Sequence, residues 1–202
     1  TLTSVDLVDV LARFHALHPQ VDIRLNVGMS ETLIANIRER RADVGFVGLW
    51  PEAPLPALPY RLLADEKLVA LLPPDHACAR RRSLSLAELA RFPLVDFHTG
   101  SGARRQTDDA FDAARIERHV HFEVDHIDLL RRIVGKGLAV GLVPSSLAAV
   151  ADGLRAVAIT DAPRRRVYAV WSAAPSPAAA AFLALLEQFL PNHSRSDHAR
   201  TR

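Results

Sequence analysis

The apolar positions of residues 122–149 change their spacing twice, and this pattern predicts three successive elements. Phe122 and Val124 alternate with polar neighbours, as strand residues do, and the apolar positions that follow recur at helical spacing. Residues 138–143 are continuously apolar, which is typical of a strand that is buried on both faces, and Pro144 ends its hydrogen bonding. The segment therefore predicts a strand, a helix and a second strand. The carboxyl ends of such strands are where open α/β sheets hold ligands.

The same alternation of helical and strand-like segments continues along the chain and predicts an α/β protein. The predicted helices span residues 4–17, 30–40, 84–91, 104–114 and 176–190. The predicted strands span residues 21–27, 43–49, 60–64, 67–72, 93–97, 119–124, 154–159 and 167–171. We also expect Gly135 and Gly137 to end the helix before the apolar strand, because glycine adopts a positive φ without strain.

The composition of the 202 residues, 49% of them hydrophobic, is that of a globular protein. Cys78 is the single cysteine, which excludes an internal disulfide and a cysteine-based zinc site. The sequence shows no apolar leader and no apolar run long enough for a bilayer, so we expect a cytoplasmic protein with no membrane partner. We interpret the arginine runs 80–82 and 164–166 as solvated turns and not as a DNA-contacting face.

Three motifs carry a resemblance to a known family. GKGLAVGLVP joins a glycine-rich helix end to an apolar strand and a proline, HP is followed by the alternating VDIRLNV, and RADVGFVGL runs from a charged turn into a buried strand. In their order and spacing these motifs resemble the effector-binding domain of LysR-type transcriptional regulators, from Thr1 to about Leu190. The resemblance implies an α/β, two-lobed periplasmic-binding-protein-like (type 2) fold with two crossover strands and a ligand cleft between the lobes.

The resemblance also implies a division of the chain. Lobe I would comprise residues 1–72 and 173–190, and lobe II residues 73–172. Residues 191–202 show no apolar periodicity, so we expect them to form a disordered tail. The chain would cross between the lobes near Leu72 and Trp171. The family's N-terminal DNA-binding domain and its opening strand would be absent, so we expect DNA contact only through a helix-turn-helix that this chain does not contain.

Polar residues at three predicted helix N-termini are the candidate effector-binding residues, because free backbone N–H groups and the helix dipole attract anions there. The first place has Thr3 and Ser4, the second Met29 and Ser30, and the third His98, Thr99, Gly100, Ser101 and Arg104. Val143 and Pro144, at the end of a predicted strand, are further candidates. The first two places match those where the family's small hydroxyl residues meet the effector. Plain N-capping is an equally good interpretation of Ser4 and Ser30.

The loop HTGSGARR is the most informative of these places. Its two glycines expose backbone N–H groups, and Arg104 can form a bidentate bond to a carboxylate, which predicts a cradle for an anion. An ordinary strand-to-helix turn with solvated arginines remains the alternative. The loop lacks the Lys and Ser/Thr of a nucleotide-phosphate loop and is not a hydrolase Gly-x-Ser-x-Gly elbow.

Neither a metal site nor a catalytic constellation emerges from the sequence. His119 and His121 share one strand face, but no third ligand accompanies them, and we expect no metal, no cofactor and no catalytic residue. The resemblance therefore implies a domain that senses a small anionic metabolite for a transcriptional regulator and forms a homodimer through its opening helix. A free-standing solute-binding protein and an enzyme of the same fold are the alternatives.

Overall fold

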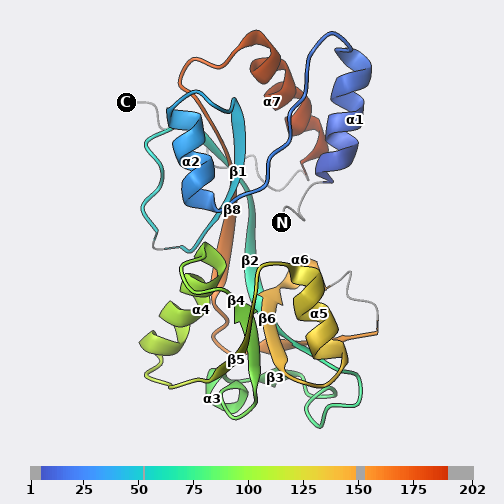
Figure 1. Ribbon diagram of the computed structural model, residues 1–202, viewed down its shortest axis with the longest axis vertical. Coiled ribbons are helices and arrows are strands. Elements are labelled where there is room, and N and C mark those ends of the chain that lie inside the picture. Colours follow the sequence, from blue (N-terminus) through green and yellow to red (C-terminus); the bar gives the residue numbers. More distant parts are fainter. Residues whose placement is uncertain (1–5, 52, 149–152, 191–202) are drawn as a thin grey trace. The chain divides into compact units, whose positions relative to one another are not determined.

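The computed structural model describes residues 6–51, 53–148 and 153–190 (Figure 1). It divides into two compact units: unit 1 comprises Thr1–Ala64 and Arg166–Arg202, and unit 2 comprises Asp65–Arg165. The division falls inside two long strands: between Ala64 and Asp65 of β2 (Tyr60–Leu72) and between Arg165 and Arg166 of β8 (Arg164–Trp171). The crossings near Leu72 and Trp171 stay predictions. The predicted tail of residues 191–202 lies outside the described residues.

Unit 1 is a sheet with helices on both faces. Its strand order is β1–β8–β2, with β1 spanning Val44–Leu49 and pairing antiparallel with β8. Its helices are α1 (Leu7–Leu17), α2 (Ser30–Arg38) and α7 (Pro177–Phe189). Figure 1 shows α1 and α7 on one side of the strands and α2 on the other.

The residues of β8 show how one strand serves both faces of this sheet. Val167 and Ala169 pack into the cluster that holds the apolar faces of α1 and α7, whereas Tyr168 and Val170 pack into the cluster under α2. Because successive side chains of a strand point to opposite faces, a continuously apolar strand is buried on both. The sequence 167–171 was predicted as a strand, and this prediction is confirmed.

The starts of the unit 1 helices differ in how well the sequence predicted them. Ser176 caps α7 through a 3.2 Å bond from Ala179 N, and Pro177 occupies its first position, as helix-start chemistry favours. The first helix begins at Leu7 and not at residue 4, because the Asp6 carboxylate accepts from Val8 N at 3.0 Å and acts as its N-cap. Thr3 and Ser4 lie outside the described residues.

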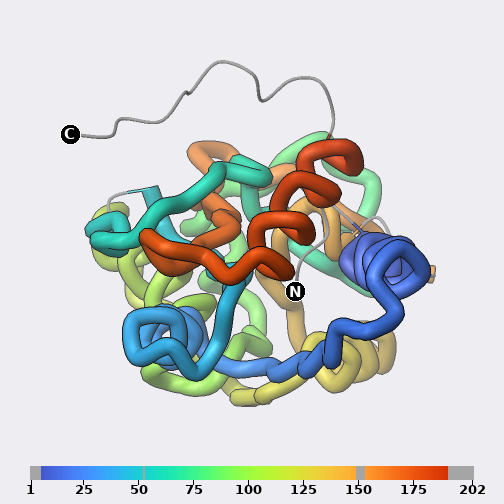
Figure 2. The backbone as a smooth tube through the Cα atoms, turned by 90° about the horizontal axis from the view of Figure 1, so that it is seen from above, coloured from blue at the N-terminus to red at the C-terminus, as the bar shows by residue number. Residues whose placement is uncertain are grey.

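The predicted strand of residues 21–27 is wrong. The segment forms no ladder with any described residue. Alternation makes a segment suitable for a strand, yet a strand exists only where a neighbour accepts its backbone hydrogen bonds. Leu25 is consequently 62% exposed and Val27 97% exposed. Figure 2 shows the segment as part of the blue tube that leads from α1 to α2.

Unit 2 is a second sheet covered on both faces. From β2 the strands run β6 (Val140–Pro144), β4 (Leu94–Phe97) and β5 (Val120–Val124), and β7 (Arg155–Ile159) and β3 (Ser83–Leu84) extend the sheet from β2 in the other direction. Its helices are α3 (Leu86–Leu89), α4 (Gly102–Ala113), α5 (Ile127–Gly135) and α6 (Ser145–Ala148). The apolar residues of α3 and α4 pack into one core cluster and those of α5 and α6 into another, so these helix pairs cover opposite faces.

Strand β6 confirms the burial expected from its continuous apolar run, since all five of its residues are buried. Gly141 lies under α5, where an added Cβ would come within 2.8 Å of Leu130 Cδ2. The glycine is therefore required by a close approach of helix to strand. Gly137 ends α5 with φ +70°, as predicted, whereas Gly135 is still part of the helix and has no positive φ.

Two further expectations need correction. The predicted helix of residues 84–91 is a short strand followed by α3, because Ser85 forms a capping box with Glu88 that starts the helix after it. The arginines 164–166 begin β8 and do not form a turn. Burial lowers the pKa of Arg165, although the charge of Glu66 acts in the opposite direction.

The strand-like segments 60–64 and 67–72 are joined in the single strand β2. None of the described helices combines the length and the apolar character that crossing a bilayer demands.

Candidate functional site

The carboxyl ends of three parallel strands meet at one edge of unit 2. β4 runs parallel to both β5 and β6, with Asp96 opposite Glu123 and Leu94 opposite Val140. The loops that follow these strands therefore emerge at the same edge, which is where α/β sheets bind ligands. Most of the residues predicted from the sequence gather here: His98, Thr99, Gly100, Ser101 and Arg104 after β4, and Val143 and Pro144 at the end of β6.

Backbone hydrogen bonds within the loop and to β5 hold the segment between β4 and α4. His98 N donates to Val124 O of β5 at 3.1 Å, and Ser101 N donates to His98 O at 3.2 Å. Gly100 has φ +91°, a conformation that favours glycine. The Ser101 hydroxyl accepts from Arg104 N at 3.1 Å and is the N-cap of α4, so this buried side chain serves the helix.

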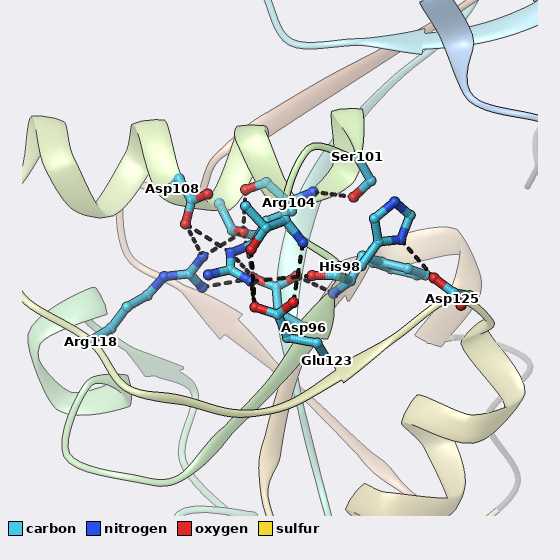
Figure 3. A network of polar contacts seen from close by, with 11 residues as sticks. Asp96, His98, Ser101, Arg104, Asp108, Arg118, Glu123 and Asp125 are labelled. Atoms are coloured by element: carbon cyan, nitrogen blue, oxygen red, sulfur yellow. Dashed lines mark hydrogen bonds and ion pairs between the residues drawn. The ribbon is translucent and has the colours of Figure 1, made fainter. Parts of the chain in front are cut away.

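The Arg104 guanidinium is bound by groups of the chain itself (Figure 3). Its side chain is 14% exposed, with Nε 2.9 Å from Asp108 Oδ1 and Nη1 2.8 Å from Glu123 Oε1. Nη1 also donates to Phe97 O at 3.3 Å. An effector carboxylate that binds Arg104 in a bidentate manner must therefore compete with one of these partners.

Glu123 completes the loop from the neighbouring strand β5. Its carboxylate accepts from Thr99 N at 3.3 Å, from Thr99 Oγ1 at 3.0 Å and from Arg104 Nη1 at 2.8 Å. These bonds, the one from Arg104 first, hold the pKa of Glu123 below its usual range. The loop thus already holds a carboxylate with a backbone N–H, a hydroxyl and a guanidinium.

A buried network of polar side chains lies next to Arg104 and shares the Asp108 carboxylate with it. Thr107 Oγ1 donates to Asp96 Oδ2 at 2.6 Å, and Arg118 Nη1 lies 2.8 Å from the same oxygen. Arg118 Nη2 reaches Asp108 Oδ1 at 2.7 Å, which links this network to Arg104. Burial raises the pKa of Asp96, although the bond from Thr107 and the charge of Arg118 act in the opposite direction.

The network carries more acidic than basic groups. Three carboxylates, those of Asp96, Asp108 and Glu123, surround two guanidinium groups, those of Arg104 and Arg118. Its formal charge with every group ionised is therefore negative. These residues are spread over β4, α4 and β5 and the residues just before β5, and only the strand register brings them together.

The sequence reasoning missed Asp96, Thr107, Asp108, Arg118 and Glu123. Glu123 occupies the polar position of the alternating strand FEV, so by sequence alone it is an outward-facing strand residue. The signal that could have found it is the parallel pairing of β4 with β5, which sets Glu123 beside the end of β4.

The remaining predicted residues of unit 2 contribute in different ways. His98 Nδ1 lies 2.7 Å from Asp125 Oδ1, so two strand-end loops are joined by this pair. Val143 has none of its surface exposed and packs in the core, and the buried Pro144 lies opposite Leu68 of β2.

In unit 1 the structure places Met29 and Ser30 at the start of α2. Met29 is the N-cap residue and is 44% exposed. The Ser30 hydroxyl donates to Gly48 O and accepts from Gly48 N, both at 3.1 Å. The interpretation of Ser30 as an N-cap is therefore wrong, because its side chain ties the helix to the end of β1.

The two α/β/α units, with two strands that run from one into the other, define a type 2 periplasmic-binding-protein-like fold. The regulatory domain of Synechocystis PCC6803 CcmR in complex with 2-PG has the same fold, with a TM-score of 0.81 at 19% identity, over 93% of this chain and 92% of that chain. The BenM effector binding domain with its effector benzoate gives a TM-score of 0.73 at 19% identity, over 96% and 92% of the two chains.

A family profile described as the LysR substrate binding domain matches residues 1–191, and the chain belongs to this family. Among its relatives, the HTH-type transcriptional regulator cbl of Escherichia coli (strain K12) is 27% identical over 153 residues, which is 71% of this chain and 45% of that protein. The chain spans about half the length of the curated relatives it matches.

Proposed function

We propose that this chain is the effector-sensing domain of a LysR-type transcriptional regulator and that its effector is a small anionic metabolite. The observation that carries the proposal is the loop of residues 98–104, which binds the carboxylate of Glu123 through Thr99 and Arg104. A loop that holds the carboxylate of Glu123 at the carboxyl end of parallel strands has the donors to hold the carboxylate of an effector in its place. The benzoate of the BenM domain is a ligand of this chemistry.

The proposed effector contacts are taken unit by unit. Thr99, Arg104 and the backbone N–H of Gly100 supply donors in unit 2. Met29 in unit 1 remains in the proposal because it is exposed at the N-terminus of α2, and Ser30 remains there as a residue that positions this terminus. The role is binding and not catalysis, in keeping with the curated relatives, which are transcriptional regulators.

The partners of the whole protein follow from the same family. We assign DNA contact to a helix-turn-helix segment, because the relatives are described as HTH-type regulators, and we place the protein in the cytoplasm, where bacterial transcription takes place. The proposed homodimer uses α1 against unit 2 of a partner. Its support is the exposed Val8 beside a shallow groove lined by Leu11, His15, Val21 and Ile23.

A thermal-shift screen against a library of carboxylates and other metabolites tests the proposal. A ligand that binds the folded domain raises its melting temperature by mass action. We expect at least one carboxylate to do so in a saturable manner and to shift the amide resonances of Thr99 and Gly100. A library in which no anion stabilises the domain would contradict the proposal.

A further inference from the structure

The carboxylate of Glu123 lies where the hydrogen-bond donors of the 98–104 loop converge. Its two carboxylate oxygens accept from Thr99 N, Thr99 Oγ1 and Arg104 Nη1. The residue comes from β5, so these contacts depend on the pairing of β4 with β5 and not on the loop's own turn.

We propose that Glu123 is a built-in competitor of the effector, whose carboxylate must displace that of Glu123 from Thr99 and Arg104. This inference rests on the proposed function, because it assigns the 98–104 loop to the effector. It makes Glu123 a specificity-determining residue of the site.

The geometry of Arg104 supplies the first argument. A guanidinium binds a carboxylate in a bidentate manner through the Nε and Nη edge or through the two Nη atoms. Nε of Arg104 already binds Asp108, and Nη1 binds Glu123 and Phe97 O. Either edge therefore opens only when one of the two carboxylates leaves.

Glu123 is the partner that leaves more readily. Asp108 is held by Arg118 as well as by Arg104, at 2.7 and 2.9 Å. Glu123 has one guanidinium partner, Arg104, among the described residues, and its side chain is 45% exposed. Released from Arg104, it can turn into water without leaving a buried charge, whereas Asp108 would leave Arg118 without this partner.

Charge balance points in the same direction. The network has three carboxylates for two guanidinium groups, so an additional anion is repelled unless one carboxylate withdraws. The Arg104 and Thr99 bonds hold the pKa of Glu123 low, which keeps it ionised and a competitor at neutral pH. A simple acid has only its carboxylate to bind with, so it competes poorly with Glu123. An effector with further polar groups makes additional hydrogen bonds and can displace the Glu123 carboxylate.

Acetate is the probe for this proposal, because it carries the same carboxylate as the glutamate side chain. The variant Glu123→Ala empties the position, and amide resonances of Thr99 and Gly100 report its reoccupation. We expect Glu123→Ala to bind acetate at least roughly tenfold more tightly than the parent domain, as the removal of a charge-assisted competitor implies. Glu117→Ala is the matched control, since Glu117 is an exposed glutamate of the same unit and its loss changes the net charge equally.

A second variant controls for the effect of alanine on the stability of strand β5. Glu123→Thr places a strand-forming residue in β5 and should show the same gain. Equal acetate affinity of the parent and both Glu123 variants, or no saturable shift at Thr99 in any of them, would overturn the proposal. An equal gain in Glu117→Ala would also overturn it, because it would reduce the effect to net charge.

The acetate experiment and the metabolite screen can reject the two proposals independently of each other. Acetate binding to Glu123→Ala needs no knowledge of the effector, whereas the metabolite screen uses the parent domain. A screen that finds an effector while the Glu123 variants gain nothing rejects only the competitor. A gain in the variants with no effector in the screen rejects only the sensing function.

Discussion

Arg118 is the residue on which the buried part of the polar network depends. Its side chain is 6% exposed and bridges Asp96, which is 3% exposed, to the half-exposed Asp108. Removing one member of a buried ion pair leaves the other charge without compensation, which is costlier than replacing both. The network therefore ties together β4, α4 and the residues before β5 at the sheet edge that carries the 98–104 loop.

We expect Arg118→Met to destabilise the domain by about 3–5 kcal/mol in urea unfolding, because Asp96 loses its buried partner. Arg91→Met, a change at an exposed arginine, should alter the free energy of unfolding by less than about 0.5 kcal/mol. Similar values for both variants would show that the network is not a stabilising unit.

Glu88 makes the stability of the folded protein depend on pH, and the direction of its pKa shift sets the sign. Its bonds to Ser85 N and to Arg81 lower its pKa from 4.5 to about 2 in the folded protein. The unfolded chain therefore binds more protons between these values, so the contribution is present above pH 4.5 and is lost as the pH falls toward about 2.

Glu88→Gln keeps a side-chain acceptor for the capping box but removes the charge. We expect its thermal midpoint to fall less steeply than that of the parent between pH 5 and pH 2, as linkage requires. Scanning calorimetry across this range measures the difference. Parallel curves for the two proteins would contradict the assignment.

At the scale of elements, the sequence predicted what local pattern determines and missed what pairing determines. The buried strand β6 and the loop of residues 98–104 after β4 follow from an apolar run and from glycine and proline positions, which act over a few residues. Residues 21–27 alternate as well as any strand but have no described neighbour to pair with. The place of Glu123 likewise depends on the register between β4 and β5, which no local pattern encodes.

The contact of α5 with β6 gives a matched pair of glycine substitutions. Gly141→Ala should destabilise the domain by roughly 1–3 kcal/mol, because the new methyl group would lie 2.8 Å from the buried Leu130. Gly135→Ala should stabilise it by about 0.5–1 kcal/mol, because Gly135 lies in the helix and an added Cβ meets nothing closer than Leu154 at 3.6 Å. Urea unfolding of both variants measures the two signs. The same sign for both would contradict this account of the packing.

At the scale of the whole molecule, the exposed apolar surface of α1 carries the proposed homodimer. Val8 is 70% exposed and lines the groove beside this helix. We expect sedimentation velocity at about 10–100 µM, a range that detects modest interfaces, to show a dimer for the parent and a monomer for Val8→Asp. Leu55→Asp, which changes an equally apolar residue of the same unit that is 47% exposed, should leave the dimer intact. A monomeric parent protein would contradict the proposal.

In the proposed function, the 98–104 loop binds the carboxylate of a small effector through Arg104. Calorimetric titration of the parent domain and of Arg104→Gln with the carboxylate identified by the thermal-shift screen tests it most directly. Glutamine keeps a hydrogen-bond donor but removes the charge, so we expect the dissociation constant to rise by roughly thirtyfold or more, which corresponds to about 2 kcal/mol. Equal affinities of the two proteins would contradict the claim and reduce the loop to an ordinary turn between β4 and α4.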